Sequence, residues 1–364
     1  MGQARQFSSK SVAIQTSALP RVCSVLVHLL LISPCLLVNQ AERSALASSP
    51  VTIGELKGDL YQIGGPSSVP TLYDVANGDL SASDHALSLL AAAESNTPPH
   101  PNMLSLRVAD GQALECGDWR KSVKNGADAD ANQVDLSQPT PTTISTMNSW
   151  PAPPELPDNS RIAPIETTVW VVNATLIEYR RSTDQDYHLN LRDASGNPLI
   201  AEIPCPCCIG PSGHFTLLIS AARSRFDSLL TATDTFQPAN IPVRVAGVGM
   251  FDFPHAQAGA APNHIELHPV LAIAFNVDLN APSIVSAVIN GNKLIVSGFN
   301  FDDGTMVLVD GESRKTRNDE ESPRMRLMAK KAGKFIAVGQ TVTIQVLKSD
   351  GALSDGFSFT KPNQ

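Results

Sequence analysis

Short strand-like runs separated by turn signals occupy most of the chain after residue 160, and one of them alternates hydrophobic and polar residues with the period of two that is typical of β-strands. In YHLNLRD (187–193), His188, Asn190 and Arg192 fall on one face of the strand and the apolar residues on the other. The β-branched and aromatic residues of TTVWVVNATLIEYR also favour a strand. The strands predicted in this part are 167–180, 187–193, 198–204, 241–253 and 264–275.

One predicted helix interrupts these strands. Within HFTLLISAARSRFDSLL, apolar residues recur at helical spacing without an intervening proline: Leu218, Ala222, Phe226 and Leu229. The resulting order, β-β-β-α-β-β, is that of an OB fold, a five-stranded barrel with one helix between strands three and four. A split antiparallel α+β sheet is the alternative. We therefore expect an OB-like β-barrel at residues 161–280.

A second all-β unit follows at residues 281–362, after a linker-like segment. Turn signals such as NGN, DDG and SDG separate six strand-like runs: 283–289, 292–301, 305–311, 324–331, 341–351 and 355–362. This arrangement predicts a β-sandwich of immunoglobulin type. The charged stretch from Glu312 to Glu321 is expected to be a solvated hairpin, with a partner-contact patch as the alternative.

The first 160 residues contain fewer signals of regular secondary structure. Residues 1–47 are typical of a signal peptide, since Arg5 and Lys10 precede an apolar run from Val22 to Val38, with small residues behind it. An uncleaved anchor helix is the alternative, and only that segment would then contact a membrane. Residues 48–160 are expected to be largely irregular and partly disordered, ending in the proline-rich linker WPAPPELP.

Composition narrows the classes of function. The chain has 364 residues, enough for two domains, and its net charge is −8. An acidic balance argues against broad electrostatic binding to nucleic acid, which needs Lys and Arg gathered on one face. Single-strand binding by the barrel is a weaker alternative, because a basic groove with stacked aromatic residues is missing from the sequence pattern.

The C-terminal unit resembles the IPT/TIG immunoglobulin-like family. The matching segments are Ala281–Ile284, Leu294–Phe301, Val307–Gly311, Gly339–Val346, Asp350–Gly351 and Phe357–Phe359. The resemblance implies a spacer or interaction module without catalysis.

The middle unit is similar to an uncharacterised OB-like domain of exported bacterial proteins. The matching segments are Asp186–Leu189, Ile200–Pro204, Gly247–Gly249, Phe251–Phe253 and Ile265–Val270. This resemblance implies a fold and export, and no particular activity. The chain departs from the pattern at Ala256, where similar proteins carry Gly, and at His264, where they carry a small residue.

Candidate binding residues gather near the end of the middle unit. Glu266 and His268 alternate with His264 and would share a strand face, and His188 and Glu202 on neighbouring strands could join them. Imidazoles and carboxylates are suitable zinc ligands. Residues i and i+4 of a strand lie roughly 13 Å apart, so His264 and His268 would share an ion only if the strand bends. A polar, hydrogen-bonded barrel face explains the same residues, and no cofactor is expected.

A second set is nuclease-like. Carboxylates could hold a divalent ion and arginines could neutralise phosphate; the residues are Asp184, Asp186, Glu202, Arg180 and Arg181. These residue types are common, and solvation at turns and strand edges explains them as well.

Four cysteines remain after the apolar N-terminal run: Cys116, Cys205, Cys207 and Cys208. A zinc site usually needs two C-x-x-C pairs, and only one is present. Disulfides are therefore expected, with Cys116 bonded to one of the other three, although three complete pairings are open.

The sequence favours an exported, non-catalytic binding protein for an unknown protein or glycan. The second hypothesis is a metal-dependent, nuclease-like hydrolase with His188, Glu202, Glu266 and His268 in its site.

Overall fold

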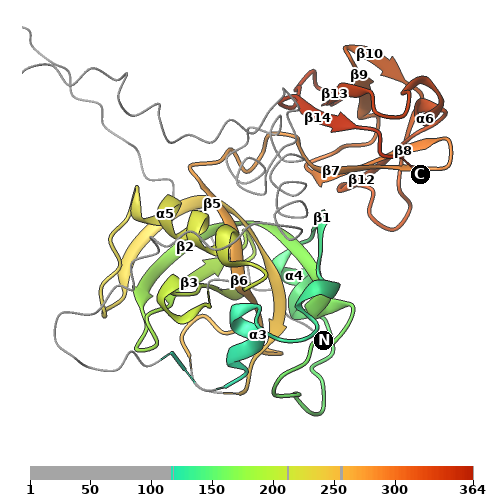
Figure 1. Ribbon diagram of the computed structural model, residues 1–364. Helices are drawn as coiled ribbons and strands as arrows, with labels where there is room; N and C mark the ends of the chain where they lie inside the picture. Colours follow the sequence, from blue (N-terminus) through green and yellow to red (C-terminus); the bar gives the residue numbers. More distant parts are fainter. Residues whose placement is uncertain (1–115, 118, 211–212, 255–256, 364) are drawn as a thin grey trace, which may run out of the picture. The chain divides into compact units, whose positions relative to one another are not determined.

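The structure, a computed structural model, describes residues 116–117, 119–210, 213–254 and 257–363, and these residues are mainly β (Figure 1). The apolar run 22–38 and the expected irregular stretch 48–115 lie outside the described residues. Within the described part, no helix has the length and apolar character needed to cross a membrane.

The first sheet is built from six strands that hydrogen-bond in the order β1-β2-β3-β4-β6-β5, and β5 also pairs with β2 (Figure 1). The pairings from β2 through β3, β4, β6 and β5 back to β2 therefore form a closed ring. The strands are β1 (Asp135–Pro141), β2 (Thr168–Arg181), β3 (Tyr187–Arg192), β4 (Pro198–Ile203), β5 (Gln237–Phe251) and β6 (Ile265–Phe275). Both ends of β2, β3, β4 and β6 lie within two residues of the predicted ends. Strand β5 also ends within two residues of its predicted end, but it starts earlier than predicted.

The helix that the apolar spacing predicts packs against this sheet. Helix α5 (Thr216–Asp227) contacts β6, and its residues Leu218, Ala222 and Phe226 are buried. Leu229 lies beyond the end of the helix and is 48% exposed, so the fourth apolar position of the predicted stripe does not belong to the core.

Residues 119–160, which the sequence pattern predicts to be largely irregular, contain short ordered elements. Helices α3 (Lys121–Asn125) and α4 (Ile144–Asn148) contact β6 and β4, η2 (Ala131–Gln133) lies between α3 and β1, and β1 pairs with β2. Val123, Ile144 and Met147 are fully buried. The proline-rich linker is also anchored, because the rings of Trp150 and Trp170 lie 4.8 Å apart. The segment lacks the periodicity of long helices or strands, which explains why its pattern predicted disorder.

Two buried ion pairs fix this segment to the start of β2. The guanidinium of Arg120 donates to both carboxylate oxygens of Glu166, at 2.7 and 2.8 Å, and both side chains are fully buried. Glu166 lies in η3 (Ile165–Thr167) and also accepts from the backbone N–H groups of Ile162 and Phe251. Arg161 donates twice to Asp128, which is equally buried.

The C-terminal part forms two four-stranded antiparallel sheets, with strand orders β10-β9-β13-β14 and β11-β12-β8-β7. Their bounds are β7 (Ser283–Asn290), β8 (Lys293–Phe299), β9 (Met306–Val309), β10 (Glu312–Arg314), β11 (Thr316–Asn318), β12 (Arg326–Ala329), β13 (Thr341–Leu347) and β14 (Phe357–Thr360); helix α6 spans Ala332–Phe335. The charged stretch 312–321 is not one hairpin: β10 pairs in one sheet and β11 in the other.

Gly298 provides a test of the packing between β7 and β8. A Cβ atom added there would collide with the carbonyl oxygen of Ser283 and lie 2.8 Å from the ring of Phe301. We expect Gly298→Ala to lower the free energy of unfolding by about 1–3 kcal/mol, the usual cost of overpacking. Urea unfolding measures this. Gly210→Ala is the matched control, because an added Cβ meets no atom within 4 Å there; equal effects of the two changes would contradict the expected crowding.

Candidate metal centre

Five ionisable side chains from β3, β4, β6 and the turn before β3 meet inside the first sheet, and we call them the His–carboxylate cluster. Its members are Asp186, His188, Glu202, Glu266 and His268. None is more than 5% exposed. The cluster therefore includes all four candidate binding residues suggested by the sequence, together with Asp186 from the nuclease-like set.

Strand register brings these residues together. His188 on β3 lies directly opposite Glu202 on β4, and Ile200 on β4 pairs with Glu266 on the parallel strand β6. Side chains two residues apart in a strand share a face. Glu202 therefore lies on the same face as Ile200, and His268 on the same face as Glu266, which brings Glu202 and His268 to the same side of the sheet. His264, by contrast, precedes β6 in a left-handed conformation with a φ of 59°, and it lines a shallow pocket with Asp252 and Glu266.

His188 connects the cluster to a second polar chain. Its Nδ1 lies 2.7 Å from Oε1 of Glu202, and its Nε2 lies 2.9 Å from Oδ1 of Asn190. The amide nitrogen of Asn190 in turn donates to Glu178 at 2.8 Å. Each polar atom of the His188 ring therefore has a partner, which holds Glu202 in one orientation.

His268 is positioned differently, because only one of its ring nitrogens forms a hydrogen bond. Nδ1 lies 3.0 Å from Oε1 of Glu266 and 3.2 Å from Oε2 of Glu202. Nε2 is buried and makes no hydrogen bond, but faces Oδ2 of Asp186 at 3.5 Å. The other oxygen of Asp186, Oδ1, accepts the backbone N–H of Cys205 at 2.8 Å.

The charges of the cluster are strongly coupled. Burial alone would lower the pKa of His268, but the close carboxylates of Asp186 and Glu266 and the charge of Glu202 raise it to about 10. Burial also opposes protonation of His188, yet its bond to Glu202 raises the pKa. For Glu202 burial raises the pKa, while the bond from His188 and the charge of His268 lower it to about 2. Burial dominates at Glu266, whose pKa is raised.

Lys124 of helix α3 adds a positive charge that sequence patterns do not reveal. Its Nζ lies 3.3 Å from Oδ2 of Asp252. Burial would lower the pKa of Lys124, but the carboxylates of Glu266, Asp252 and Glu202 together raise it. A single lysine in a segment without periodicity gives no signal of this role, and only the fold places it near the cluster.

The nuclease-like set is divided by the structure. Asp186 and Glu202 belong to the cluster, whereas Arg181 forms an exposed pair with Asp234 and Arg180 lies over the ring of Phe236, 4.8 Å from its centroid. Both arginines of the nuclease-like set therefore contact residues outside the cluster.

Three cluster residues have the geometry of a metal site. One ligand atom each from Asp186, Glu202 and His268 lies within 4.8 Å of the others. Zinc bonds of roughly 2.0–2.2 Å in a tetrahedron need ligand atoms about 3.3–3.6 Å apart. A contraction of the order of 1 Å would therefore bring the three atoms to zinc distances.

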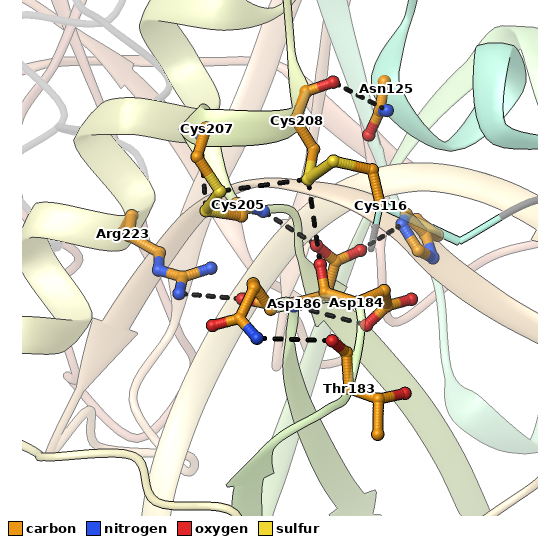
Figure 2. Close-up of a disulfide and its surroundings, with 11 residues drawn as sticks. Cys116, Asn125, Thr183, Asp184, Asp186, Cys205, Cys207, Cys208 and Arg223 are labelled. Atoms are coloured by element: carbon orange, nitrogen blue, oxygen red, sulfur yellow. Dashed lines mark hydrogen bonds and ion pairs between the residues drawn. A yellow bond between two sulfur atoms is a disulfide. The ribbon is translucent and has the colours of Figure 1, made fainter. Parts of the chain in front are cut away.

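The turn that carries Asp186 is hydrogen-bonded to a loop that contains two disulfides (Figure 2). Cys116 is bonded to Cys208, and Cys205 to Cys207, which is one of the three pairings that the sequence leaves open. Cys205 follows β4 and belongs to the same loop as η4 (Pro206–Cys208). The neighbouring residues Cys207 and Cys208 are not bonded to each other, although their sulfur atoms lie 3.8 Å apart.

Comparison with known proteins does not place the chain in a family. No protein-family model matches the sequence, and no significant match is found among curated proteins.

Proposed function

We propose that the first sheet forms a binding module that takes up one divalent transition-metal ion through Asp186, Glu202 and His268. The observation that supports this proposal is the convergence of three ligand atoms within 4.8 Å of one another inside the protein. Two carboxylates and one imidazole form a ligand set suited to zinc, manganese or iron.

The surroundings of each ligand support the same proposal. Metal-bound histidines usually engage a carboxylate through the second ring nitrogen, and bound carboxylates are themselves hydrogen-bonded. Here Glu266 contacts Nδ1 of His268, His188 contacts one oxygen of Glu202, and the N–H of Cys205 binds one oxygen of Asp186. Nε2 of His268, which makes no hydrogen bond, is the nitrogen left for the ion.

Burial favours binding over hydrolysis. Asp186, Glu202 and His268 are 5%, 4% and 0% exposed, so a polymeric substrate would not reach an ion held between them in the described structure. A hydrolytic metal site keeps an open position for water and substrate. The proposal is therefore a non-catalytic metal-binding module, and the nuclease-like alternative is not favoured.

Calorimetric titration with zinc tests this proposal on the oxidised, full-length protein without reductant. We expect one zinc site in the wild type and at least about 100-fold weaker binding in Asp186→Asn. Loss of a residue that only hydrogen-bonds to a metal ligand already lowers metal affinity by about 10–100-fold, and loss of the ligand itself should lower it at least as much. Asp184→Asn is the matched control: it removes a carboxylate from the same turn that is not one of the three ligands.

Zinc X-ray absorption of the wild type provides a second measurement that does not depend on a variant. We expect nitrogen and oxygen ligands with one imidazole and no sulfur. Absence of binding in the wild type, sulfur ligation, or equal losses in Asp186→Asn and Asp184→Asn would overturn the proposal.

We further propose that the closed ring of strands is an OB-like barrel, that residues 281–362 form an IPT/TIG-like interaction module, and that the protein is exported. The strand order β-β-β-α-β-β and the two four-stranded sheets support the fold proposals. Two disulfides support export, because such bonds persist in oxidising compartments. A protein or glycan remains the proposed partner; fractionation of cells with an antibody against residues 281–362 would test export.

A further inference from the structure

The two disulfides are in direct contact, and this contact suggests an activity separate from metal binding. Sγ of Cys207 lies 3.8 Å from Sγ of Cys208, so one sulfur of each disulfide touches a sulfur of the other (Figure 2). Thiol–disulfide exchange proceeds by attack of a thiolate on a disulfide sulfur, so the two sulfur atoms must be able to come into contact. All four cysteines of the described part therefore belong to one connected set.

The two bonds differ in their exposure to solvent. Cys207 is exposed, whereas Cys205, Cys208 and Cys116 are half-buried. The half-buried Cys208 also accepts a hydrogen bond, because its backbone carbonyl oxygen lies 3.3 Å from the side-chain amide nitrogen of Asn125. A bulky thiol in solution would thus meet the Cys205–Cys207 bond before it meets Cys116–Cys208.

We propose that these cysteines form a two-disulfide relay, in which a dithiol-bearing protein reduces Cys205–Cys207 and the electrons then pass to Cys116–Cys208. In the first step the partner dithiol becomes a disulfide, and Cys205 and Cys207 become thiols. In the second, the Cys207 thiolate attacks Sγ of Cys208, so the Cys207–Cys208 bond forms, the Cys116–Cys208 bond breaks, and Cys116 leaves as a thiolate.

The third step restores the entry site. The Cys205 thiolate attacks Sγ of Cys207, the Cys205–Cys207 bond re-forms, and Cys208 leaves as a thiolate that takes a proton from water. The bond between adjacent residues Cys207 and Cys208 is transient, because a disulfide between neighbours departs from favourable geometry. Two electrons have then moved from the partner to the Cys116/Cys208 pair, and one disulfide remains in the protein.

The relay also fits the anchoring of the fold. Arg120 remains tied to Glu166 by two buried hydrogen bonds, and Arg161 to Asp128. The segment after Cys116 is therefore held in place by contacts that do not depend on the disulfide. Opening Cys116–Cys208 would leave the first sheet assembled, which an exchanging disulfide requires.

Alkylation followed by mass spectrometry tests the relay on the oxidised full-length protein. A reduced thioredoxin-class protein supplies the dithiol, and the rate of thiol appearance at Cys116 is measured. We expect this rate to fall at least tenfold in Cys205→Ser/Cys207→Ser, which removes the entry disulfide. Pro206→Ala is the matched control, because it changes the same loop and keeps all four cysteines.

A second experiment uses only the wild type. One equivalent of reduced dithiol protein is added, and samples are quenched with acid after seconds and after an hour before labelling. We expect early label at Cys205 and Cys207, with label at Cys116 and Cys208 in at least a tenth of the molecules later. Unchanged label positions, or an equal rate at Cys116 in the double variant, would overturn the relay. Neither of these two outcomes bears on the proposal of zinc binding, which is tested separately.

Discussion

Replacing Glu166 by Gln is expected to lower the free energy of unfolding by about 3–5 kcal/mol, the usual cost of breaking a buried ion pair. Glu166 is 0% exposed and accepts four hydrogen bonds, two from Arg120 and two from backbone N–H groups. The amide of Gln keeps the shape but removes the negative charge, so the buried guanidinium of Arg120 loses its counter-ion. Urea unfolding followed by circular dichroism measures the loss.

Asp234→Asn is the matched control for this prediction. Asp234 pairs with Arg181 at 2.8 Å, but both side chains are exposed, at 78% and 40%. Exposed pairs contribute about 0–1 kcal/mol, so the control should lower stability by less than 1 kcal/mol. If both variants lost the same small amount, Arg120 and Glu166 would not form the anchor between the N-terminal segment and the sheet.

Zinc affinity is expected to rise about tenfold for each pH unit between pH 6 and 8, because binding must displace one proton. The pKa of His268 is raised to about 10, so its imidazole is protonated throughout this range, and each added pH unit increases the neutral fraction tenfold. Glu202 adds no slope, since its pKa is lowered to about 2 and it is ionised throughout. Titration against a zinc-buffering chelator gives the dissociation constant at each pH.

The same titration in Asp184→Asn should keep this slope, because Asp184 is outside the three ligands. An affinity that stayed constant from pH 6 to 8 would mean that no proton leaves the site. His268 would then not bind zinc as a protonated imidazole: either it is no ligand, or its ring is already neutral in this range.

The strand positions were predictable because their signal is local. Alternation and β-branched residues define β2, β3 and β6, and these strands fixed the faces on which His188, Glu266 and His268 lie. His264 shows the limit of that reasoning. A regular strand would place it on the same face as Glu266, but the positive φ at residue 264 ends the pattern one residue before β6 begins.

Other features depend on contacts between distant residues. Arg120 and Glu166 are 46 residues apart and carry the charges that normally indicate exposed positions, so the sequence pattern gave no sign of a buried anchor. Lys124 likewise lies in a segment without hydrophobic periodicity, so the sequence pattern does not indicate that it lies near the cluster. Disulfide pairing depends on which loops the fold brings together, and the sequence therefore left three alternatives for Cys116, Cys205, Cys207 and Cys208.

The parallel ladder between β4 and β6 has a consequence for how this protein can change during evolution. It joins only two residue pairs, Ile200 with Glu266 and Ala201 with Leu267. A slip of one residue in a strand turns every side chain to the other face, which would separate Glu266 and His268 from Glu202. Selection for the cluster would therefore act also on Ile200, Ala201 and Leu267, apolar residues without chemistry of their own.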